Sequence, residues 1–386
     1  MLEPVAHSAV LERYQAALQS LADQSRLRML GPRSGFDFTS NDYLGLASSQ
    51  RMADVLTAAL ARGTAIGAGG SRLLRGNAPE HEELEVAAAA FFRAERTLFF
   101  GSGYFANFAV LSTLPQSDDL IILDEWVHAS AREGARAGRA AKIEAAHNDT
   151  CAINDQILAW RAQGGRGRIW IAVESLYSMD GDRAPLRDLM ALADHHDAFL
   201  IVDEAHATGV LGPDGRGVSA PFEGRPNVVV LHTCSKALGG AGALVSLPRV
   251  LCDFLVNRCR PFIYSTAPSP LMAVAALEAL AILKEEPQRR ENLARLVAHA
   301  GKESKRRCGI TASGSQILPV IVGDDRRSML IAAALRARGF DVRGIRPPTV
   351  PAGSARLRIS LTLNVDENAI SELFDALAEE LSVVSG

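Results

Sequence analysis

The feature that most constrains the fold of this 386-residue chain is a regular alternation of two patterns between Thr97 and Ser246. Short apolar runs rich in β-branched residues, such as Val228–Leu231, are separated by stretches with helical periodicity, such as Ile153–Gln163 and Leu186–His196. Continuous apolar strands between helices are typical of a parallel sheet that is buried on both faces. The sequence therefore predicts an α/β fold with a largely parallel sheet. The expected strands are Thr97–Phe100, Leu120–Leu123, Lys142–Ala145, Ile169–Glu174, Phe199–Asp203, Val228–Leu231 and Ala243–Ser246.

Other patterns flank this region on both sides. Residues 1–45 are typical of an amphipathic helix followed by a short strand, and Ser269–Arg307, interrupted only at Pro287, predicts one or two long helices. A smaller α+β region is expected downstream, with strands at Ile317–Val322, Asp341–Gly344 and Leu357–Leu361 and helices around Met329–Arg338 and Asp366–Leu381. We therefore expect an N-terminal arm over residues 1–46, a large domain over 47–280 and a small C-terminal domain over 281–386.

Composition and charge argue against several classes of partner. Forty-one Lys and Arg against 44 Asp and Glu leave a net charge of −3, which supplies no overall field to attract nucleic acid or an anionic membrane. Met1–Pro4 does not begin a secretory signal, and the apolar run Pro261–Leu277 is too short and too broken by prolines to span a membrane. We expect a cytoplasmic protein without a metal site. Its five cysteines, which form no CxxC pair, are expected to be buried reduced thiols: Cys151, Cys234, Cys252, Cys259 and Cys308.

The sharpest chemical pattern follows two successive predicted strands. One strand ends at Asp203, with His206 three positions later, and the next runs into Thr233-Cys-Ser-Lys236 and then into small residues. Lys236 follows Asp203 by 33 residues, about one strand–helix–strand step. Because ligands collect at the carboxyl ends of parallel strands, we expect these side chains to share one edge of the sheet.

These residue types suit a Schiff base between Lys236 and pyridoxal phosphate. Neighbouring hydroxyls can hold the phosphate, small residues let the cofactor approach, and apolar surroundings lower the pKa of the amine. Asp203 would pair with the pyridinium nitrogen, and His206 would reach the ring hydroxyl. Taken singly, a lysine is usually solvated and an aspartate at a strand end usually caps a helix, so the prediction depends on the joint spacing.

Two nucleotide-binding interpretations of this region are weaker than the pyridoxal phosphate interpretation. Phe99–Asn107 follows a strand and opens a helix, so its glycines can bring backbone amides to a phosphate. A dinucleotide site is disfavoured because Ala106 takes the place of the third glycine in GxGxxG. The acidic stretch Asp203–His206 is also found in ATPases, but those need a phosphate loop, and the Gly-Lys pair of this chain, Gly301-Lys302, is followed by glutamate in a helical region.

Taken together, the motifs resemble those of the α-oxoamine synthases, pyridoxal phosphate enzymes with the aspartate aminotransferase fold, fold type I. The matching stretches follow in order along nearly the whole chain: Phe38–Leu46, Gly67–Arg72, Gly76-Asn77, His81–Leu84, Ser178–Asp182, Val202–Gly209, Thr233–Lys236 and Ile263–Thr266. The resemblance implies a mostly parallel seven-stranded sheet with helices on both faces and a smaller α+β C-terminal domain. It also implies pyridoxal 5'-phosphate as the cofactor and a homodimer with shared active sites.

The resemblance further implies a role for each matching position. Lys236 would hold the cofactor and then act as a base, while His128 would lie over the pyridine ring, although a histidine at a strand-to-helix junction often only caps the helix. The other implied cofactor contacts are Gly103, Tyr104, Ser178, Asp203, His206 and Thr233, with Thr266 coming from the partner subunit. The implied substrate contacts are Arg26, preferred over Arg28, together with Asn41, Thr349 and Arg358, whose planar fork suits the carboxylate of the amino acid.

The substrates implied by the resemblance are L-alanine and a pimeloyl thioester. Ile345–Arg358 is most similar to family members that join the two with loss of CO2 and thiol in biotin biosynthesis, with coenzyme A or an acyl carrier protein as the carrier. Cys234–Gly242 and Ser71–Asn77 are equally similar to glycine-using members of the 5-aminolevulinate synthase or 2-amino-3-ketobutyrate CoA ligase type, and to members that join alanine to a different, small acyl group. A fold-type I lyase or aminotransferase is the alternative in another reaction class. A third alternative is a non-enzymatic binding protein, which would show no cofactor absorbance.

Overall fold

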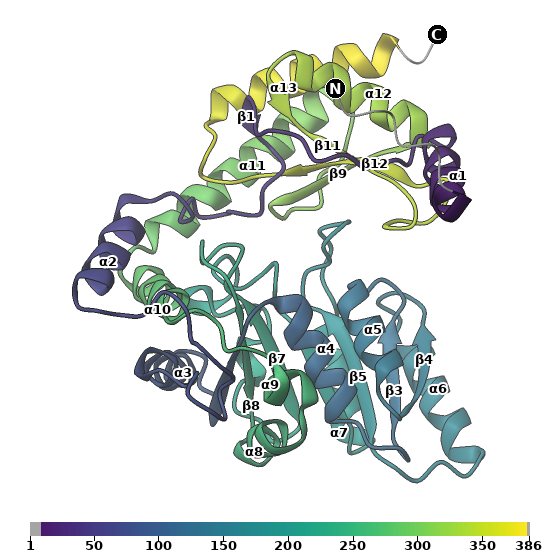
Figure 1. Ribbon diagram of the computed structural model, residues 1–386. Coiled ribbons are helices and arrows are strands. Elements are labelled where there is room, and N and C mark those ends of the chain that lie inside the picture. The colour runs from purple at the N-terminus through teal and green to yellow at the C-terminus, as the bar shows by residue number, and fades with distance from the viewer. Residues whose placement is uncertain (1–8, 384–386) are drawn as a thin grey trace. The chain divides into compact units, whose positions relative to one another are not determined.

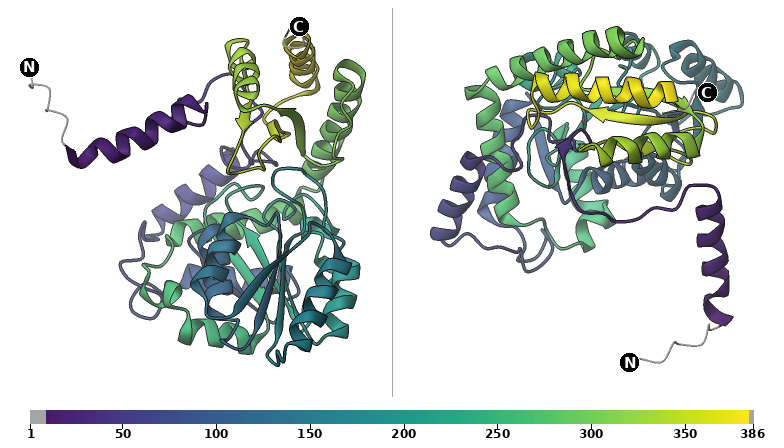
Figure 2. Two further views of the ribbon diagram at one scale, coloured as in Figure 1. Left: turned by 90° about the vertical axis from the view of Figure 1, so that its right-hand side faces the viewer. Right: turned by 90° about the horizontal axis from the view of Figure 1, so that it is seen from above.

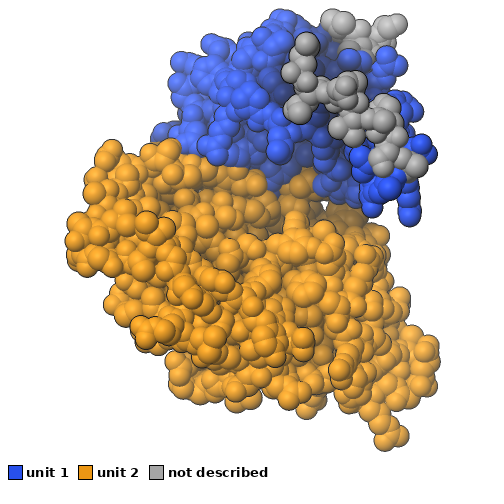
Figure 3. Space-filling view, viewed as in Figure 1, with its two compact units in different colours: residues 1–40, 295–386 blue, residues 41–294 orange. Residues whose placement is uncertain are grey.

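The computed structural model describes residues 9–383 (Figure 1). Met1–Pro4, whose composition argues against a secretory signal, lies outside the described residues. The chain divides into two compact units, a larger one of residues 41–294 and a smaller one that combines residues 1–40 and 295–386 (Figure 3). The three-part division after residues 46 and 280 stays a prediction about domains. The compact units divide elsewhere. Helix α10 (Pro270–Glu285) continues past residue 280 and packs against α2 (Gln50–Ala61) and α3 (Pro79–Phe91) of the larger unit.

A seven-stranded sheet forms the centre of the larger unit and confirms the predicted fold class. Its strand order is β2-β8-β7-β6-β5-β3-β4, and every neighbouring pair is parallel except the two that involve β8. The bounds are β2 Arg96–Phe100, β3 Leu120–Asp124, β4 Ala141–Ala145, β5 Ile169–Glu174, β6 Phe199–Asp203, β7 Val228–Thr233 and β8 Ala243–Leu247. Each predicted strand is present to within two residues at either end.

Helices lie on both sides of this sheet, as Figures 1 and 2 show. Side chains alternate between the two faces of a strand, so Ile201 joins one apolar cluster while Leu200 and Val202 join the other. Helices α4 (Gly103–Thr113), α5 (Ala129–Ala137), α8 (Arg249–Arg258) and α9 (Arg260–Tyr264) cover the first face, and α6 (Thr150–Ala162) and α7 (Leu186–His195) cover the second. The remaining helices of this unit are α2 Gln50–Ala61, α3 Pro79–Phe91, α10 Pro270–Glu285, and the short η1 Pro213–Gly215 and η2 Ala220–Phe222.

The strand order places the functional edge of the sheet. From β3 the chain passes to β4 on one side and then to β5 on the other, so the order reverses around β3. Such reversals open a crevice at the carboxyl ends of the strands. The last residues of four strands lie at this edge and are all buried: Asp124, Glu174, Asp203 and Thr233.

The smaller unit has a three-stranded antiparallel sheet in the order β11-β12-β9. Its elements are α1 Ala9–Asp23, β1 Phe36–Asp37, β9 Ile317–Gly323, α12 Asp325–Ala337, β10 Phe340–Asp341, β11 Arg343–Ile345, β12 Ala355–Ser360 and α13 Glu367–Val383. The prediction of one strand over Asp341–Gly344 is wrong. The chain forms two strands around the buried Val342, because β10 pairs with the N-terminal β1 while β11 pairs with β12.

Two other expectations are resolved by the structure. The stretch around Pro287 forms two helices, α10 and α11 (Gln288–Cys308), with the proline in the break between them. The expectation of five buried thiols is wrong for Cys151, which is exposed on α6, and for the half-buried Cys308, whereas the other three are buried. Within residues 9–383, no helix is long and apolar enough to cross a membrane.

Candidate active site

Lys236, which follows β7, lies at the end of a chain of hydrogen-bonding groups that passes through His206, which follows β6, to Tyr43 and Asn41. Its Nζ is 2.8 Å from Nε2 of His206, and Nδ1 of His206 is 2.6 Å from the hydroxyl of Tyr43. The Tyr43 hydroxyl donates to Oδ1 of Asn41 over 3.0 Å. Because that donation uses its only proton, the hydroxyl accepts from Nδ1–H of His206, which leaves Nε2 as an acceptor for the Lys236 amine.

This arrangement brings three predicted residues together and adds one that the sequence reasoning missed. Lys236, His206 and Asn41 were all predicted site residues, although Asn41 was assigned to the substrate rather than to this chain of contacts. Tyr43 is fully buried and fixes the tautomer of the histidine. Its signal was present in the sequence, because it lies in the Phe38–Leu46 stretch that resembles the family.

Asp203 ends β6 with both carboxylate oxygens hydrogen-bonded. Oδ2 accepts from the side-chain amide of Asn107 at 2.6 Å, and Oδ1 accepts from the backbone N–H of Ala205 at 2.8 Å. The same Asn107 amide donates to Ser130 Oγ at 3.1 Å. Asn107 is buried on α4, and the sequence reasoning gave it no role. It fixes the orientation of the carboxylate that was predicted to meet a pyridinium nitrogen.

His128 is both a helix cap and an exposed ring at this edge. Its Nδ1 accepts from the backbone N–H of Ser130, at the start of α5, and lies 2.8 Å from Ser130 Oγ. The capping role that histidines commonly have at such junctions is therefore present. The residue is nevertheless exposed, so these contacts fix a ring whose surface can still meet a planar ligand.

Ser178 and the buried Glu174 extend the site along the neighbouring strand. Glu174 is the cross-strand partner of Asp203, and its Oε2 accepts from the backbone N–H of Ser178 at 3.1 Å. Burial, and then the nearby charge of Asp203, raise the pKa of Glu174 to about 8. The pair of neighbouring carboxyl groups therefore favours a neutral Glu174 beside a charged Asp203. The sequence reasoning missed Glu174 because it reads as the last residue of an apolar strand.

A small cradle lies where α4 begins beside the end of β7. Ser102 caps α4 by accepting from the N–H of Phe105 at 3.2 Å, which leaves the first amides of the helix directed outward. A Cβ atom at Gly103 would lie only 3.3 Å from Oγ1 of Thr233, and that hydroxyl is 3.1 Å from Ser235 Oγ. Backbone amides at a helix N-terminus with two hydroxyls suit a phosphate group. The residues present therefore fit the phosphate of a pyridoxal cofactor.

The other predicted residues lie outside these contacts. Tyr104 is the exception, because its ring lies edge-on to that of His128 with 6.3 Å between centroids, while its hydroxyl is paired with Glu133. Thr266 is exposed between α9 and α10. The predicted substrate residues Arg26, Thr349 and Arg358 belong to the smaller unit, where Arg26 Nε is 2.7 Å from Asp325 and Arg358 Nη1 is 2.6 Å from Ser360 Oγ. Thr349 is exposed. Their roles toward a substrate stay predictions.

Comparison with known proteins identifies the family. Residues 33–377 match the aminotransferase class I and II family. The 8-amino-7-oxononanoate synthase of Anaeromyxobacter dehalogenans is 41% identical over 361 residues, which cover 93% of this chain and 89% of the relative.

Two solved structures are similar over almost the whole fold. Serine palmitoyltransferase from S. paucimobilis, bound to a PLP–myriocin aldimine, has a TM-score of 0.87 at 26% identity and covers 98% of this chain and 99% of its own. The 8-amino-7-oxononanoate synthase of Francisella tularensis has a TM-score of 0.75 at 26% identity and covers 92% and 99%. The strand order, the Lys236 edge and these similarities agree, and the chain belongs to the class I and II aminotransferase family, as an α-oxoamine synthase of fold type I.

Proposed function

We propose that this protein joins L-alanine to a pimeloyl thioester with loss of CO2, releasing 8-amino-7-oxononanoate and a free thiol. The enzyme is a pyridoxal phosphate-dependent acyltransferase of biotin biosynthesis. The observation that carries the proposal is the meeting of Lys236, His206 and Asp203 at one sheet edge, in a chain about 40% identical to 8-amino-7-oxononanoate synthases.

Each part of the cofactor has a matching group in the larger unit. Lys236 offers an amine, Asp203 offers an oriented carboxylate for the ring nitrogen, and the cradle at Gly103 and Thr233 offers amides and a hydroxyl for the phosphate. When bound, pyridoxal phosphate supplies an electron-withdrawing ring that stabilises negative charge at the α-carbon of the amino acid. Asp203 supports that function because its charge keeps the ring nitrogen protonated.

The contacts of Lys236 support a proposed route for the protons. Lys236 Nζ accepts the α-proton of alanine and passes the resulting positive charge toward Nε2 of His206, 2.8 Å away. Tyr43 and Asn41 hold His206 in the tautomer that can accept it. The deprotonated α-carbon then attacks the thioester carbonyl, and the sulfur leaves as a thiolate that takes up a proton. The carboxylate of the former alanine is released as CO2, and a proton returns to the α-carbon. We assign the binding of that carboxylate to Arg358, and contact with the acyl chain to Thr349 and Arg26.

The proposal includes the assembly and the location of the enzyme. We propose a cytoplasmic homodimer in which Thr266 of the partner subunit contacts the cofactor phosphate. The exposure of Thr266 in the single chain supports this role, because a partner can reach it there. Either coenzyme A or an acyl carrier protein delivers the pimeloyl group.

Thiol release across a small substrate panel tests the function. L-alanine, glycine and L-serine are each paired with pimeloyl-CoA, a pimeloyl carrier-protein thioester and acetyl-CoA, and free thiol and CO2 are measured. We expect both products from alanine with a pimeloyl thioester, and neither from Lys236→Ala. Thiol release only with glycine and acetyl-CoA would contradict the proposal and indicate an enzyme of the glycine-using type. Pyruvate formed from alanine without any acyl donor would indicate an aminotransferase instead.

A further inference from the structure

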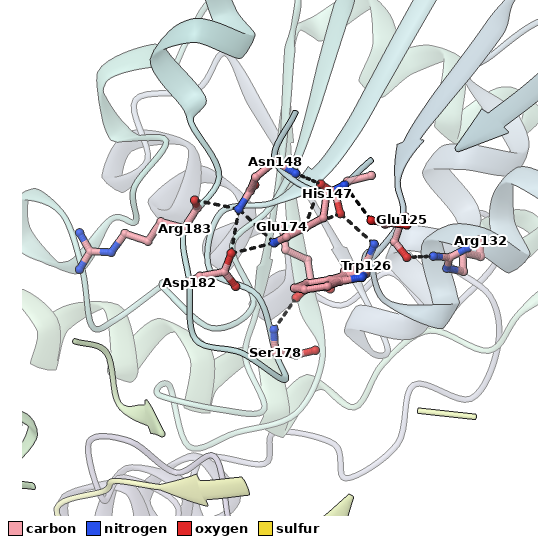
Figure 4. Close-up of polar contacts among 10 residues, drawn as sticks. Glu125, Trp126, Arg132, His147, Asn148, Glu174, Ser178, Asp182 and Arg183 are labelled. Carbon is pink, nitrogen blue, oxygen red and sulfur yellow. Dashed lines mark hydrogen bonds and ion pairs between the residues drawn. The ribbon is translucent and has the colours of Figure 1, made fainter. Parts of the chain in front are cut away.

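A histidine outside the proposed reaction joins three neighbouring strand ends of the larger unit (Figure 4). His147 lies two residues beyond β4, and its Nδ1 is 2.9 Å from Oδ1 of Asp124, the last residue of β3. Its Nε2 is 2.7 Å from Oδ2 of Asp182, which lies in the loop after β5. Strands β5, β3 and β4 are consecutive in the sheet, so His147 connects the loops that leave all three.

Both ring nitrogens of His147 face a carboxylate, and a hydrogen bond to each carboxylate needs a hydrogen on each nitrogen. The side-chain amide of Asn148 also lies 3.0 Å from Nε2, but the carboxylate of Asp182 is nearer, at 2.7 Å. A neutral imidazole has a single N–H, and only the protonated ring can donate to both Asp124 and Asp182. The ring is also enclosed by aromatic groups, with Trp126 stacked at 3.9 Å between centroids and Tyr177 edge-on at 4.4 Å. Asp124 is 2% exposed, which makes its pairing with a cation important for stability.

The two carboxylates also order the loops that carry His128 and Ser178. Asp124 precedes His128 by four residues, and its Oδ1 accepts from the N–H of Trp126 at 2.8 Å. Asp182 follows Ser178 by four residues, and the backbone of the loop closes on itself through Tyr177 N–H to Asp182 O at 2.9 Å. Asn148 joins the same two carboxylates, because its backbone N–H donates to Asp124 Oδ2 and its side-chain amide donates to Asp182 Oδ2, both at 2.8 Å. His147 therefore holds the two loops together with Asn148, and His147 is the member of this pair that can carry a charge.

We propose that His147 is a positioning residue that fixes His128 and Ser178 against the cofactor by bridging Asp124 and Asp182. It touches no reacting atom and acts through the two loops. The inference rests on the proposed function, because that function assigns His128 and Ser178 to the cofactor ring. It predicts that loss of the bridge weakens cofactor binding in the folded enzyme.

The bridge is expected to be sensitive to alkaline pH. Burial alone would lower the pKa of His147, but hydrogen bonds and charge from Asp124 and Asp182 outweigh burial and raise it to about 9. The other ionisable groups at this position are Tyr177, whose ring packs edge-on, and Glu125, which accepts from the His147 backbone. Because the folded pKa lies above the ordinary value of 6.5, the bridge is complete at neutral pH and is lost as pH rises through about 9.

His147→Gln tests this role, with His195→Gln as the matched control at an exposed position on α7. The dissociation constant of pyridoxal phosphate is measured from the visible absorbance of the loaded enzyme, from about pH 8 to about pH 10. We expect the affinity of wild type and H195Q for pyridoxal phosphate to fall in a step near pH 9. We expect H147Q to bind pyridoxal phosphate roughly tenfold more weakly than wild type at pH 8 and to show no such step. Equal binding, or the same step in H147Q, would overturn the inference.

Asp182→Asn is a second variant that keeps a side chain of the same size at a partly exposed position. His147 then faces one carboxylate, so the step in cofactor affinity is expected to move to lower pH. An unchanged step would contradict the bridge even if H147Q failed to fold. Thiol release by wild type is measured in parallel. An enzyme that binds pyridoxal phosphate but releases no thiol would contradict the proposed function, while its cofactor affinity would still decide the role of His147.

Discussion

His206 has a defined hydrogen bond at each ring nitrogen, and the Tyr43 hydroxyl determines which nitrogen carries the proton. Tyr43→Phe removes that hydroxyl and leaves a buried N–H without an acceptor, which costs about 1 to 3 kcal/mol. We expect a lower free energy of unfolding and a kcat reduced about tenfold, with little change in KM for the thioester. Urea unfolding and thiol release measure the two effects.

Tyr14→Phe is the control for this change, because Tyr14 is 66% exposed on α1. It makes the same chemical substitution in the smaller unit and should leave both measurements unaltered. If Tyr43→Phe leaves kcat at the wild-type value while stability falls, the hydroxyl is structural and does not orient His206.

Asp203 is the residue that we propose pairs with the cofactor ring nitrogen, and its two oxygens are already oriented by Asn107 and Ala205. Asp203→Asn preserves the shape but removes the negative charge, so the ring nitrogen loses its proton. We expect thiol release to fall by about 10² to 10⁴-fold. Asp188→Asn, an exposed change on α7, should leave the rate unchanged. A wild-type rate in Asp203→Asn would exclude the pairing with the ring nitrogen.

The positions of candidate site residues in the fold were predictable from sequence where the family pattern or the spacing identifies them. Lys236, Asp203 and His206 could be brought to one edge because each follows a predicted parallel strand. Asn107 and Glu174 could not be found in this way, because their roles depend on which strands and helices are neighbours in space. Asn107 reaches Asp203 across 96 residues of sequence, a contact that no local pattern encodes.

Helices α4 and α5 pack closely enough that a single methyl group would separate them. A Cβ atom at Gly134 would lie 2.8 Å from Cα of Phe108. Because α4 carries Asn107 and α5 begins beside His128, we expect Gly134→Ala to reduce the free energy of unfolding by about 1 to 3 kcal/mol and to weaken cofactor binding. Thermal unfolding and cofactor absorbance measure both.

Gly301→Ala provides the comparison on another helix. A Cβ atom there meets only Ala312 Cβ, at an ordinary 3.6 Å, and alanine favours a helix by about 0.5 to 1 kcal/mol over glycine. We expect that variant to be as stable as wild type or slightly more stable. Similar losses in both variants would show that close packing of α4 on α5 is not the cause.

Elements with strong periodicity were predictable, and those defined by a distant partner were not. The buried strands β3, β5 and β7 are continuous apolar runs, which is the pattern that parallel strands between helices require. The reversed direction of β8 leaves no such mark on its own residues. The division of Asp341–Gly344 into β10 and β11 depends on pairing with β1, which lies about 300 residues earlier in the sequence.

At the scale of the whole molecule, the proposed cofactor site and the proposed substrate contacts come from different parts of the chain. The groups assigned to the cofactor within one chain all lie in the larger unit, whereas Arg26, Thr349 and Arg358 belong to the smaller unit. With a net charge of only −3, anionic substrates must be held by such individual residues rather than by an overall field. The sequence could predict these residues only through the family resemblance.

The proposed sharing of active sites between two copies leads to a complementation test. Tyr264, two residues before Thr266 in the sequence, lines a groove of about 910 Å³ bordered by α8 and α9 and is 73% exposed, as expected of a surface that another chain covers. Lys236→Ala removes the amine of a site, and Thr266→Asp places a negative charge where the partner subunit would meet the phosphate. Each variant alone should form an inactive dimer.

A mixed dimer of these two variants contains one site with both native residues, because Lys236 comes from one chain and Thr266 from the other. Random reassortment makes about half of the dimers mixed, so about a quarter of the sites are intact. Thiol release after co-refolding should therefore recover to about a quarter of the wild-type rate. Different affinity tags on the two variants show by co-purification that mixed dimers have formed. If mixed dimers are recovered and still release no thiol, Thr266 serves the cofactor of its own chain or none, and the shared site is excluded.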